Sequence, residues 1–197
     1  MIKIGITGGI GSGKSVVASL LRLFGVPVYI ADEESKWLTN HSSIIRERLI
    51  ELFGNDIYTK SGLDKKLLAS HIFNDSGQLE RVNRIIHPEV NRHFLEWAAG
   101  LDTPICAIES AILFESGFDK AVDKSLMVYA PKEIRIARAL KRDHASREEI
   151  VRRINSQMSD EEKKLRSDFI IINDDSQTLI PQVDHLLSLL DPRRLGS

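Results

Sequence analysis

The chain has 197 residues, of which 42% are hydrophobic and 28% charged, the composition of an ordinary globular protein with room for one α/β domain and inserted lobes. Its formal net charge of −1 gives no overall field that draws a protein to nucleic acid or to a membrane, so we expect neither as a partner. No apolar run approaches the roughly 20 residues that span a bilayer, and the N-terminus lacks the pattern of a secretory leader, so we expect a cytoplasmic location.

Five short apolar runs alternate with longer helical patterns along the chain, an order that is typical of βαβ units and a parallel sheet. One of these runs contains Cys106, the only cysteine, which therefore cannot form an intramolecular disulfide. Its apolar neighbours indicate a small buried side chain rather than a nucleophile. We expect the strands at residues 2–7, 26–31, 103–110, 124–130 and 168–173.

The first strand leads into the glycine-rich stretch "GITGGIGSGKSV", which fits the P-loop pattern Gly8-x-x-x-x-Gly13-Lys14-Ser15 and opens a helix. Glycines let the backbone turn so that successive N–H groups converge on phosphate oxygens, and the helix N-terminus adds partial positive charge there. Lys14 would reach the β- and γ-phosphates, and the Ser15 hydroxyl would ligate Mg²⁺. The residues expected to bind the nucleotide are Gly11, Ser12, Gly13, Lys14, Ser15 and Val16.

The nucleotide we expect is ATP. The sequence contains neither the Asn-Lys-x-Asp base reader nor the Asp-x-x-Gly switch that a GTPase would carry. This favours transfer of a phosphoryl group to a small acceptor.

Asp32 comes directly after the second predicted strand, at the sheet edge where the P-loop lies and where ligands of parallel sheets gather. A carboxylate there could orient an acceptor hydroxyl and take its proton during transfer. The alternative is that Asp32 only caps the helix that begins with "EESKWL". Position alone leaves the two interpretations about even.

Residues 33–102 are too long for a simple crossover and predict a helical insertion, suited to a substrate lobe, with turns at "FGND" and "KSGLD". In this lobe His87 and Pro88 begin the helical stretch "HPEVNRHFLEW". We expect residues 1–197 to form a single domain, of which this lobe is one part. The core is expected at residues 1–32, 103–130 and 168–190, and the lid at residues 131–167.

The predicted lid is helical and rich in arginine. Arg135, Arg138 and Arg142 share one helix face, from which their guanidinium groups could close over the nucleotide and stabilise the transferring group. The alternative is a solvated face, paired to Glu133, Asp143 and Glu149. Helix starts are expected at Pro131, Ser146 and Ser159, and the spacing pairs Arg153 with Gln157.

Two glutamates near the third strand are further candidates. Glu109 ends that strand, where an acid could hold Mg²⁺ through water, and Glu115 follows closely. Either residue could instead cap a helix or pair with a lysine.

The motifs "ITGGIGSGKS", "AD", "LDKKLLASHIFND", "IIHPEV", "ILFE", "RIARALKRD", "RRINSQ" and "SDFIIIND" resemble those of the dephospho-coenzyme A kinase family in order and spacing, over almost the whole chain. The resemblance implies an α/β fold of the P-loop NTPase type, a parallel five-stranded sheet flanked by helices, with a helical substrate lobe and a helical lid. It also implies that ATP phosphorylates the ribose 3′-hydroxyl of dephospho-CoA in the last step of CoA synthesis, with no obligate protein partner.

Carried over by position, the resemblance makes Asp32 the acceptor-orienting base and Arg138 and Arg142 the lid contacts to phosphate. His87 and Lys65 would shape the acceptor pocket. The chain departs from the family where Lys65 stands in place of a usual arginine, which gives charge without a bidentate fork. It departs again where Arg135 stands in place of a usual glutamine.

Two other functions fit parts of this pattern. A nucleoside monophosphate kinase or another small-alcohol kinase would share the architecture, and its choice of acceptor would separate it. A regulatory nucleotide-binding module that contacts a partner or RNA would bind ATP without turnover. The near-neutral charge and the lack of stacking aromatics in the basic segment argue against that module.

Overall fold

The structure is a computed structural model that describes residues 1–73, 75–143, 145–191 and 193. These residues form two compact units. One contains residues 1–30 and the described part of 100–197, and the other contains residues 31–99. The second unit falls within three residues of the insertion expected at 33–102. Within the described ranges, no helix is long and apolar enough to cross a membrane.

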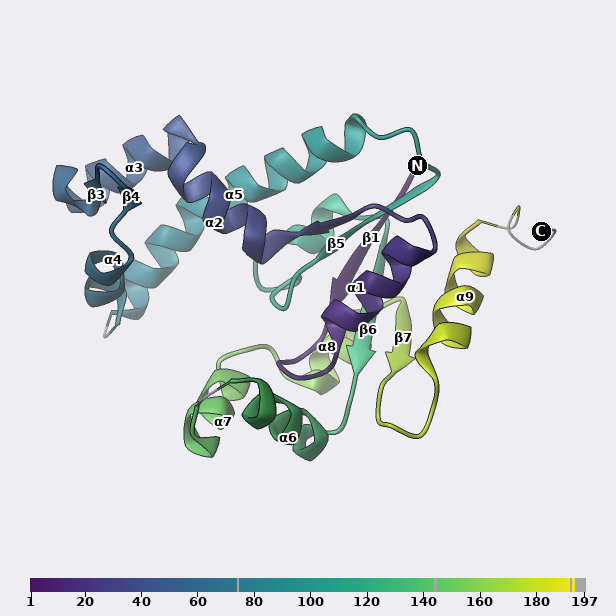
Figure 1. Cartoon of the computed structure of the whole chain (residues 1–197). Coiled ribbons are helices and arrows are strands. Elements are labelled where there is room, and N and C mark those ends of the chain that lie inside the picture. Colours follow the sequence, from purple (N-terminus) through teal and green to yellow (C-terminus); the bar gives the residue numbers. More distant parts are fainter. Residues whose placement is uncertain (74, 144, 192, 194–197) are drawn as a thin grey trace. The chain divides into compact units, whose positions relative to one another are not determined.

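A parallel five-stranded sheet forms the centre of the first unit, with the strand order β2-β5-β1-β6-β7 (Figure 1). All five strands predicted from the sequence are confirmed, and Cys106 is fully buried in one of them. Burial also raises the pKa of the Cys106 thiol, in line with a structural side chain. The strands are β1 (Ile2–Thr7), β2 (Val28–Ile30), β5 (Ile105–Glu109), β6 (Lys124–Tyr129) and β7 (Phe169–Ile172).

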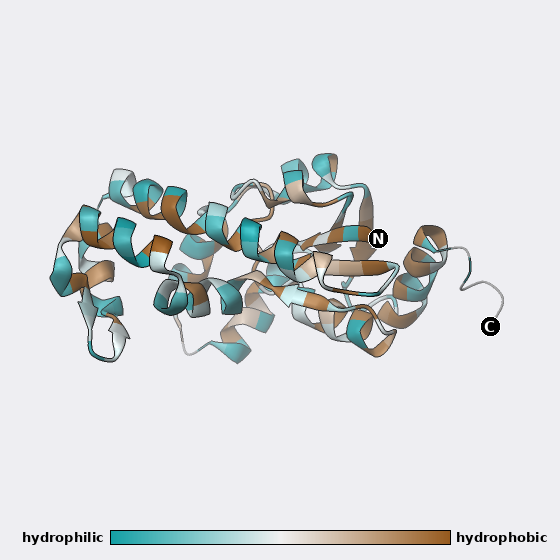
Figure 2. Ribbon diagram, turned by 90° about the horizontal axis from the view of Figure 1, so that it is seen from above, coloured by the Kyte–Doolittle hydropathy of each residue, from teal (hydrophilic) through white to brown (hydrophobic). Residues whose placement is uncertain are grey.

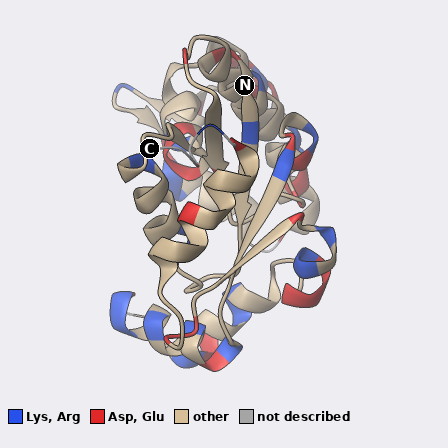
Figure 3. Cartoon of the chain, turned by 90° about the vertical axis from the view of Figure 1, so that its right-hand side faces the viewer, with Lys and Arg blue, Asp and Glu red and all other residues tan. Residues whose placement is uncertain are grey.

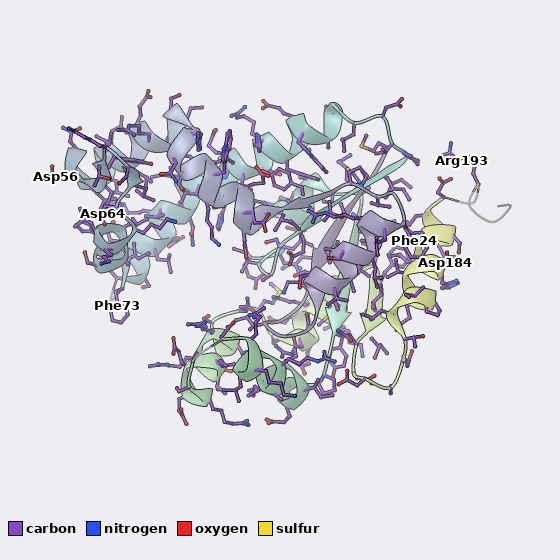
Figure 4. All side chains as sticks on the ribbon, viewed as in Figure 1. Phe24, Asp56, Asp64, Phe73, Asp184 and Arg193 are labelled. Atoms are coloured by element: carbon purple, nitrogen blue, oxygen red, sulfur yellow. The ribbon has the colours of Figure 1, made fainter. Side chains whose placement is uncertain are left out.

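Helices α1 (Lys14–Leu23) and α9 (Leu179–Leu190) pack on the sheet and on each other. Brown and teal residues alternate along both helices (Figure 2). The buried apolar residues of each recur at helical spacing and face the core. Phe24, labelled in Figure 4 at the end of α1, packs against this core. The fully buried members include Ile4, Ile6, Val17, Leu21, Leu126, Val128 and Val183.

Three helices follow β6: α6 (Lys132–Arg142), α7 (Arg147–Asn155) and α8 (Asp160–Arg166). Charged residues of both signs crowd their surface (Figure 3), while Ile136, Ala139 and Ile150 form a small core between α6 and α7. Ser146 and Ser159 start their helices as predicted, since each hydroxyl accepts a backbone N–H of the first turn. Pro131 stands one residue before α6.

The second unit is mainly helical, as expected: α2 (Ala31–His41), α3 (Ser43–Phe53), α4 (Lys65–Ile72) and α5 (Ser76–Ala99). A two-stranded hairpin, β3 (Tyr58–Thr59) and β4 (Gly62–Leu63), was not predicted; its turn lies in the "KSGLD" signal. Asp64 (Figure 4) caps α4 by accepting the backbone N–H groups of Lys66 and Leu67.

One local prediction was wrong, and one open alternative is excluded. The helix expected to begin at His87 and Pro88 begins at Ser76 and runs through Pro88. The packing of α5 against α2, α3 and α4 outweighs the hydrogen bond that proline cannot donate. The capping alternative for Asp32 also fails, because α2 already begins at Ala31 and Asp32 lies in its first turn.

Candidate active site

The loop between β1 and α1 has the backbone that a phosphate cradle needs. Gly8 and Gly13 have φ values of +147° and +93°, which L side chains rarely adopt. A Cβ on Gly8 would lie 2.7 Å from the Ser12 hydroxyl and closer still to the carbonyl oxygen of Val128. The two glycines that the P-loop pattern fixes are therefore required by local geometry in this chain.

The charged and hydroxyl side chains follow at the start of α1. Lys14 lies back across the loop, with Nζ 3.5 Å from the carbonyl oxygen of Gly9. Ser15 and Val16 are exposed in the first turn of α1, where the backbone N–H of Val16 donates to the carbonyl oxygen of Gly13 at 3.0 Å. The helix N-terminus, the lysine and the hydroxyl thus follow one another at the start of α1, and this combination suits the binding of polyphosphate.

Asn173, which follows β7, secures the loop from the side. Its amide donates to the carbonyl oxygen of Ser12 at 2.8 Å, and a Cβ on Gly13 would collide with that amide. The Ser12 side chain is fully buried and its hydroxyl oxygen has no hydrogen-bond partner within the described residues. Sequence reasoning missed Asn173, although its motif "SDFIIIND" was noted.

Arg138 joins this arrangement through Asn173. Its Nη1 donates to the Asn173 carbonyl at 2.9 Å and its Nη2 to the Asp175 carboxylate at 2.6 Å. Arg142 lies on the exposed end of α6, and its Nε donates to Asp143 at 2.8 Å. The structure therefore brings Arg138 into contact with a residue of the loop's support and leaves Arg142 at the solvent.

The arginine face predicted on α6 is incomplete, because Arg135 does not belong to it. Its side chain is only 2% exposed and bonds to the P-loop backbone and to Asp160. A buried, fully engaged guanidinium cannot swing over a nucleotide. The sequence did not reveal that Arg135 is buried, because helical spacing shows which residues share a face but not which of them are covered by other segments.

A cavity of about 530 Å³ lies beside Gly9. Lys132 and Gln157 line it, together with the start of α8. The Gln157 side-chain oxygen is buried and has no hydrogen-bond partner within the described part of the chain. The cavity therefore presents a cation and an unsatisfied polar group next to the phosphate-binding loop.

Of the two glutamates, Glu115 pairs with a lysine, one of the alternatives given for it. Lys163 is fully buried, donates to the carbonyl oxygen of Ala111 at 2.7 Å and lies 3.2 Å from the Glu115 carboxylate. Glu115 also accepts the backbone N–H of Met158 at 2.9 Å. Glu109 is the last residue of β5, where it was expected.

The three remaining predicted residues lie in the second unit. Asp32 is exposed in the first turn of α2, Lys65 is the exposed first residue of α4, and His87 is half-buried in α5. Helices α2 and α4 both pack against α5. Burial lowers the pKa of His87, so its ring is neutral at pH 7.

The Mg²⁺ ion predicted at Ser15 requires few protein ligands. Among the described residues, no group of three or more His, Cys, Asp or Glu side chains could hold a metal ion. Mg²⁺ keeps several waters and takes phosphate oxygens, so a single hydroxyl such as that of Ser15 fits its needs in a nucleotide site.

Comparison with known proteins gives consistent results over most of the chain. The dephospho-CoA kinase family model matches residues 2–178. A dephospho-CoA kinase of Bacteroides fragilis is 53% identical over 190 residues, which are 96% of this chain and 93% of that protein.

Two solved structures extend the likeness to the fold. One from Thermus thermophilus is 34% identical with a TM-score of 0.80, covering 98% of this chain and 97% of that one. A dephospho-CoA kinase of Campylobacter jejuni is 26% identical with a TM-score of 0.69, covering 97% of this chain and 98% of that one. The similarity therefore spans both compact units.

Proposed function

The chain belongs to the dephospho-CoA kinase family, and we propose on that premise that it moves the γ-phosphoryl group of ATP to the ribose 3′-hydroxyl of dephospho-CoA. The products are CoA and ADP, and the reaction is the final step of CoA biosynthesis. The observation that carries this proposal is the family match over residues 2–178 together with an intact P-loop at its start.

The loop and the first turn of α1, residues 11–16, hold the phosphates of ATP. Lys14 neutralises charge on the β- and γ-phosphates as the bond between them breaks. The Ser15 hydroxyl would hold Mg²⁺, which would supply positive charge to offset the charge that develops on the phosphates. Arg138, anchored to Asn173, and the exposed Arg142 add further cations that contact phosphate.

Asp32 is the base that we assign to the acceptor. Ile30 of β2 and Ile6 of β1 both register with Glu109 of β5, so the two strands end at the same edge of the sheet. The P-loop leaves that edge after β1, and Asp32 follows Ile30 by two residues. The assignment of Asp32 as the base rests on this connectivity and on the family pattern.

In the transfer step the 3′-oxygen forms a bond to the γ-phosphorus while the bond from that phosphorus to the β,γ-bridging oxygen breaks. ADP leaves with the electron pair of the broken bond. The hydroxyl proton moves to the Asp32 carboxylate, which first orients the hydroxyl by accepting its hydrogen bond. His87 and Lys65 complete the acceptor pocket, a role proposed from the family pattern. A cytoplasmic location and the absence of an obligate protein partner remain predictions.

The test is ADP release with ATP and Mg²⁺, comparing dephospho-CoA with AMP as the acceptor. We expect ADP release when dephospho-CoA is the acceptor and none when AMP is. The Lys14→Ala variant should release no ADP with either acceptor. Turnover with AMP would favour a nucleoside monophosphate kinase. ATP binding without turnover on either acceptor would favour a regulatory nucleotide-binding module. Either of these two results would contradict the proposal.

A further inference from the structure

Arg135 is enclosed where three segments of the first unit meet. Its Nε donates to the carbonyl oxygen of Ala130 at 3.1 Å, just after β6, and its Nη1 donates to the carbonyl oxygen of Ile10 at 3.3 Å in the P-loop. Its Nη2 donates to the carboxylate of Asp160, the first residue of α8. With only 2% of the side chain exposed, this guanidinium is a structural junction.

The P-loop is shaped around this side chain. A Cβ on Gly9 would lie 2.7 Å from Cζ of Arg135, and one on Gly11 would lie 2.9 Å from its carbonyl carbon. Both distances are below the 3.0 Å that real Cβ atoms keep. The P-loop pattern leaves these two positions open. At Gly9 the close approach of the Arg135 guanidinium disfavours any side chain, and at Gly11 the φ of +79° and the nearby Arg135 backbone both do so.

The contact with Ile10 fixes the direction of one peptide group. In a trans peptide the C=O and the following N–H point in opposite directions. Because the Ile10 carbonyl faces the Arg135 guanidinium, the N–H of Gly11 points away from it. The hydrogen bond thus determines which way a phosphate-binding N–H of the loop is aimed.

A second contact holds the same part of the loop. The side chain of Ile10 packs against the small core of Ile136, Ala139 and Ile150 between α6 and α7. The tip of the P-loop is therefore fixed to these helices through both its backbone and a side chain.

Burying a guanidinium is unfavourable unless it is paired and its hydrogen bonds are satisfied. Asp160, whose side chain is 19% exposed, supplies the opposite charge. Replacing Arg135 removes the hydrogen bond to the Ile10 carbonyl and leaves Asp160 without its counter-charge. Replacing Asp160 leaves the buried guanidinium uncompensated, so in either case the loop loses the support that sets its conformation.

We propose that Arg135 is a positioning residue, which with Asp160 holds the P-loop in the conformation that binds ATP and ties that loop to α8. It acts through the Ile10–Gly11 peptide rather than by touching phosphate. This inference rests on the proposed use of ATP as the donor.

The test measures ADP affinity by isothermal titration calorimetry for Arg135→Lys, Asp160→Asn and the double variant. Lysine keeps the charge but loses the fork that reaches three acceptors. We expect each single variant to bind ADP about tenfold more weakly, and the double variant to be no worse than the weaker single, as for residues in one network. KM for ATP should rise in parallel, while KM for dephospho-CoA stays the same.

The matched control is the ion pair of Arg147 and Glu133, which joins α7 to α6 at 2.7 Å with side chains that are 52% and 72% exposed. Arg147→Ala should bind ADP like the wild type. Urea unfolding curves of every variant identify the conditions in which each is fully folded, and the ADP titrations are carried out there. If Arg135→Lys does not fold, the titration of Asp160→Asn tests the inference by itself.

Unchanged ADP affinity in folded variants that have only lost stability would overturn the inference, since it would leave Arg135 a purely structural residue. The titration contains no dephospho-CoA, so it tests the P-loop independently of the acceptor. A wild-type enzyme that binds ADP but does not phosphorylate dephospho-CoA would contradict the proposed function and leave this inference standing.

Discussion

Gly11 and Gly25 form a natural pair for testing how the P-loop is built. Both have a φ of +79°, so alanine at either position incurs the same backbone cost, of about 1–2 kcal/mol. The surroundings differ. Nothing lies within 4 Å of a Cβ on Gly25, whereas a Cβ on Gly11 would lie 2.9 Å from the Arg135 carbonyl carbon and closer still to its oxygen.

The clash at Gly11 is with backbone, which cannot rotate away as a side chain would. Relieving such overpacking adds about 1–3 kcal/mol. We therefore expect Gly25→Ala to lower the free energy of unfolding by about 1 kcal/mol and Gly11→Ala by about 3 kcal/mol. For a chain of this size each kcal/mol corresponds to a fall in Tm of about 2–4 °C.

Urea unfolding followed by circular dichroism measures the difference in stability, and an ADP titration measures the state of the loop. Gly25→Ala should bind ADP like the wild type, and Gly11→Ala should bind it at least about tenfold more weakly. Equal losses of stability in the two variants, or normal ADP affinity in Gly11→Ala, would refute the reasoning, because the close approach of Arg135 would then impose no constraint.

Three further predictions concern other residues. Asp32→Asn should lower kcat by about 100-fold or more, the usual contribution of a general base, with ATP affinity unchanged in a titration; near-normal turnover would remove the assignment. Burial lowers the pKa of His87 from 6.5, so its contribution to stability is present above about pH 6.5 and is lost as the pH falls through the lower folded value. Between pH 7.5 and pH 5, the urea midpoint of His87→Gln should therefore fall by less than that of the wild type. An equal fall would show that the titration of His87 does not cause the pH dependence. Lys163→Ala should lower the free energy of unfolding by about 3 kcal/mol, because the Glu115 carboxylate and a buried carbonyl lose their partner. The exposed control Lys141→Ala should change it by less than about 0.5 kcal/mol, and similar losses in both would contradict the account.

The parts of this fold that sequence predicts are those governed by local chemistry. Strands covered on both faces are apolar along their length, as β5 is. The edge strand "FIII" is equally apolar, although Ile170 is exposed, and these runs together identify the sheet. A P-loop needs glycine at fixed offsets and a lysine at a helix start, and Ser146 and Ser159 cap helices through their own hydroxyls. Each of these signals lies within a few residues of the structure that it predicts.

The features that sequence missed depend on contacts between distant segments. Arg135 bonds to a loop 125 residues earlier in the chain, and Asn173 donates to a carbonyl 161 residues earlier. No local pattern distinguishes such residues from solvated ones. Pro88 predicts a helix start locally, and only the packing of α5 on three other helices shows why the helix continues through it.

The most direct measurement follows the labelled γ-phosphate of ATP onto dephospho-CoA and onto its 3′-deoxy and 2′-deoxy ribose analogues. The proposed reaction predicts labelled CoA, equal labelling of the 2′-deoxy analogue, and none of the 3′-deoxy analogue. Labelling of the 3′-deoxy analogue at a rate like that of dephospho-CoA would contradict it, because the phosphoryl group would then go to a different hydroxyl.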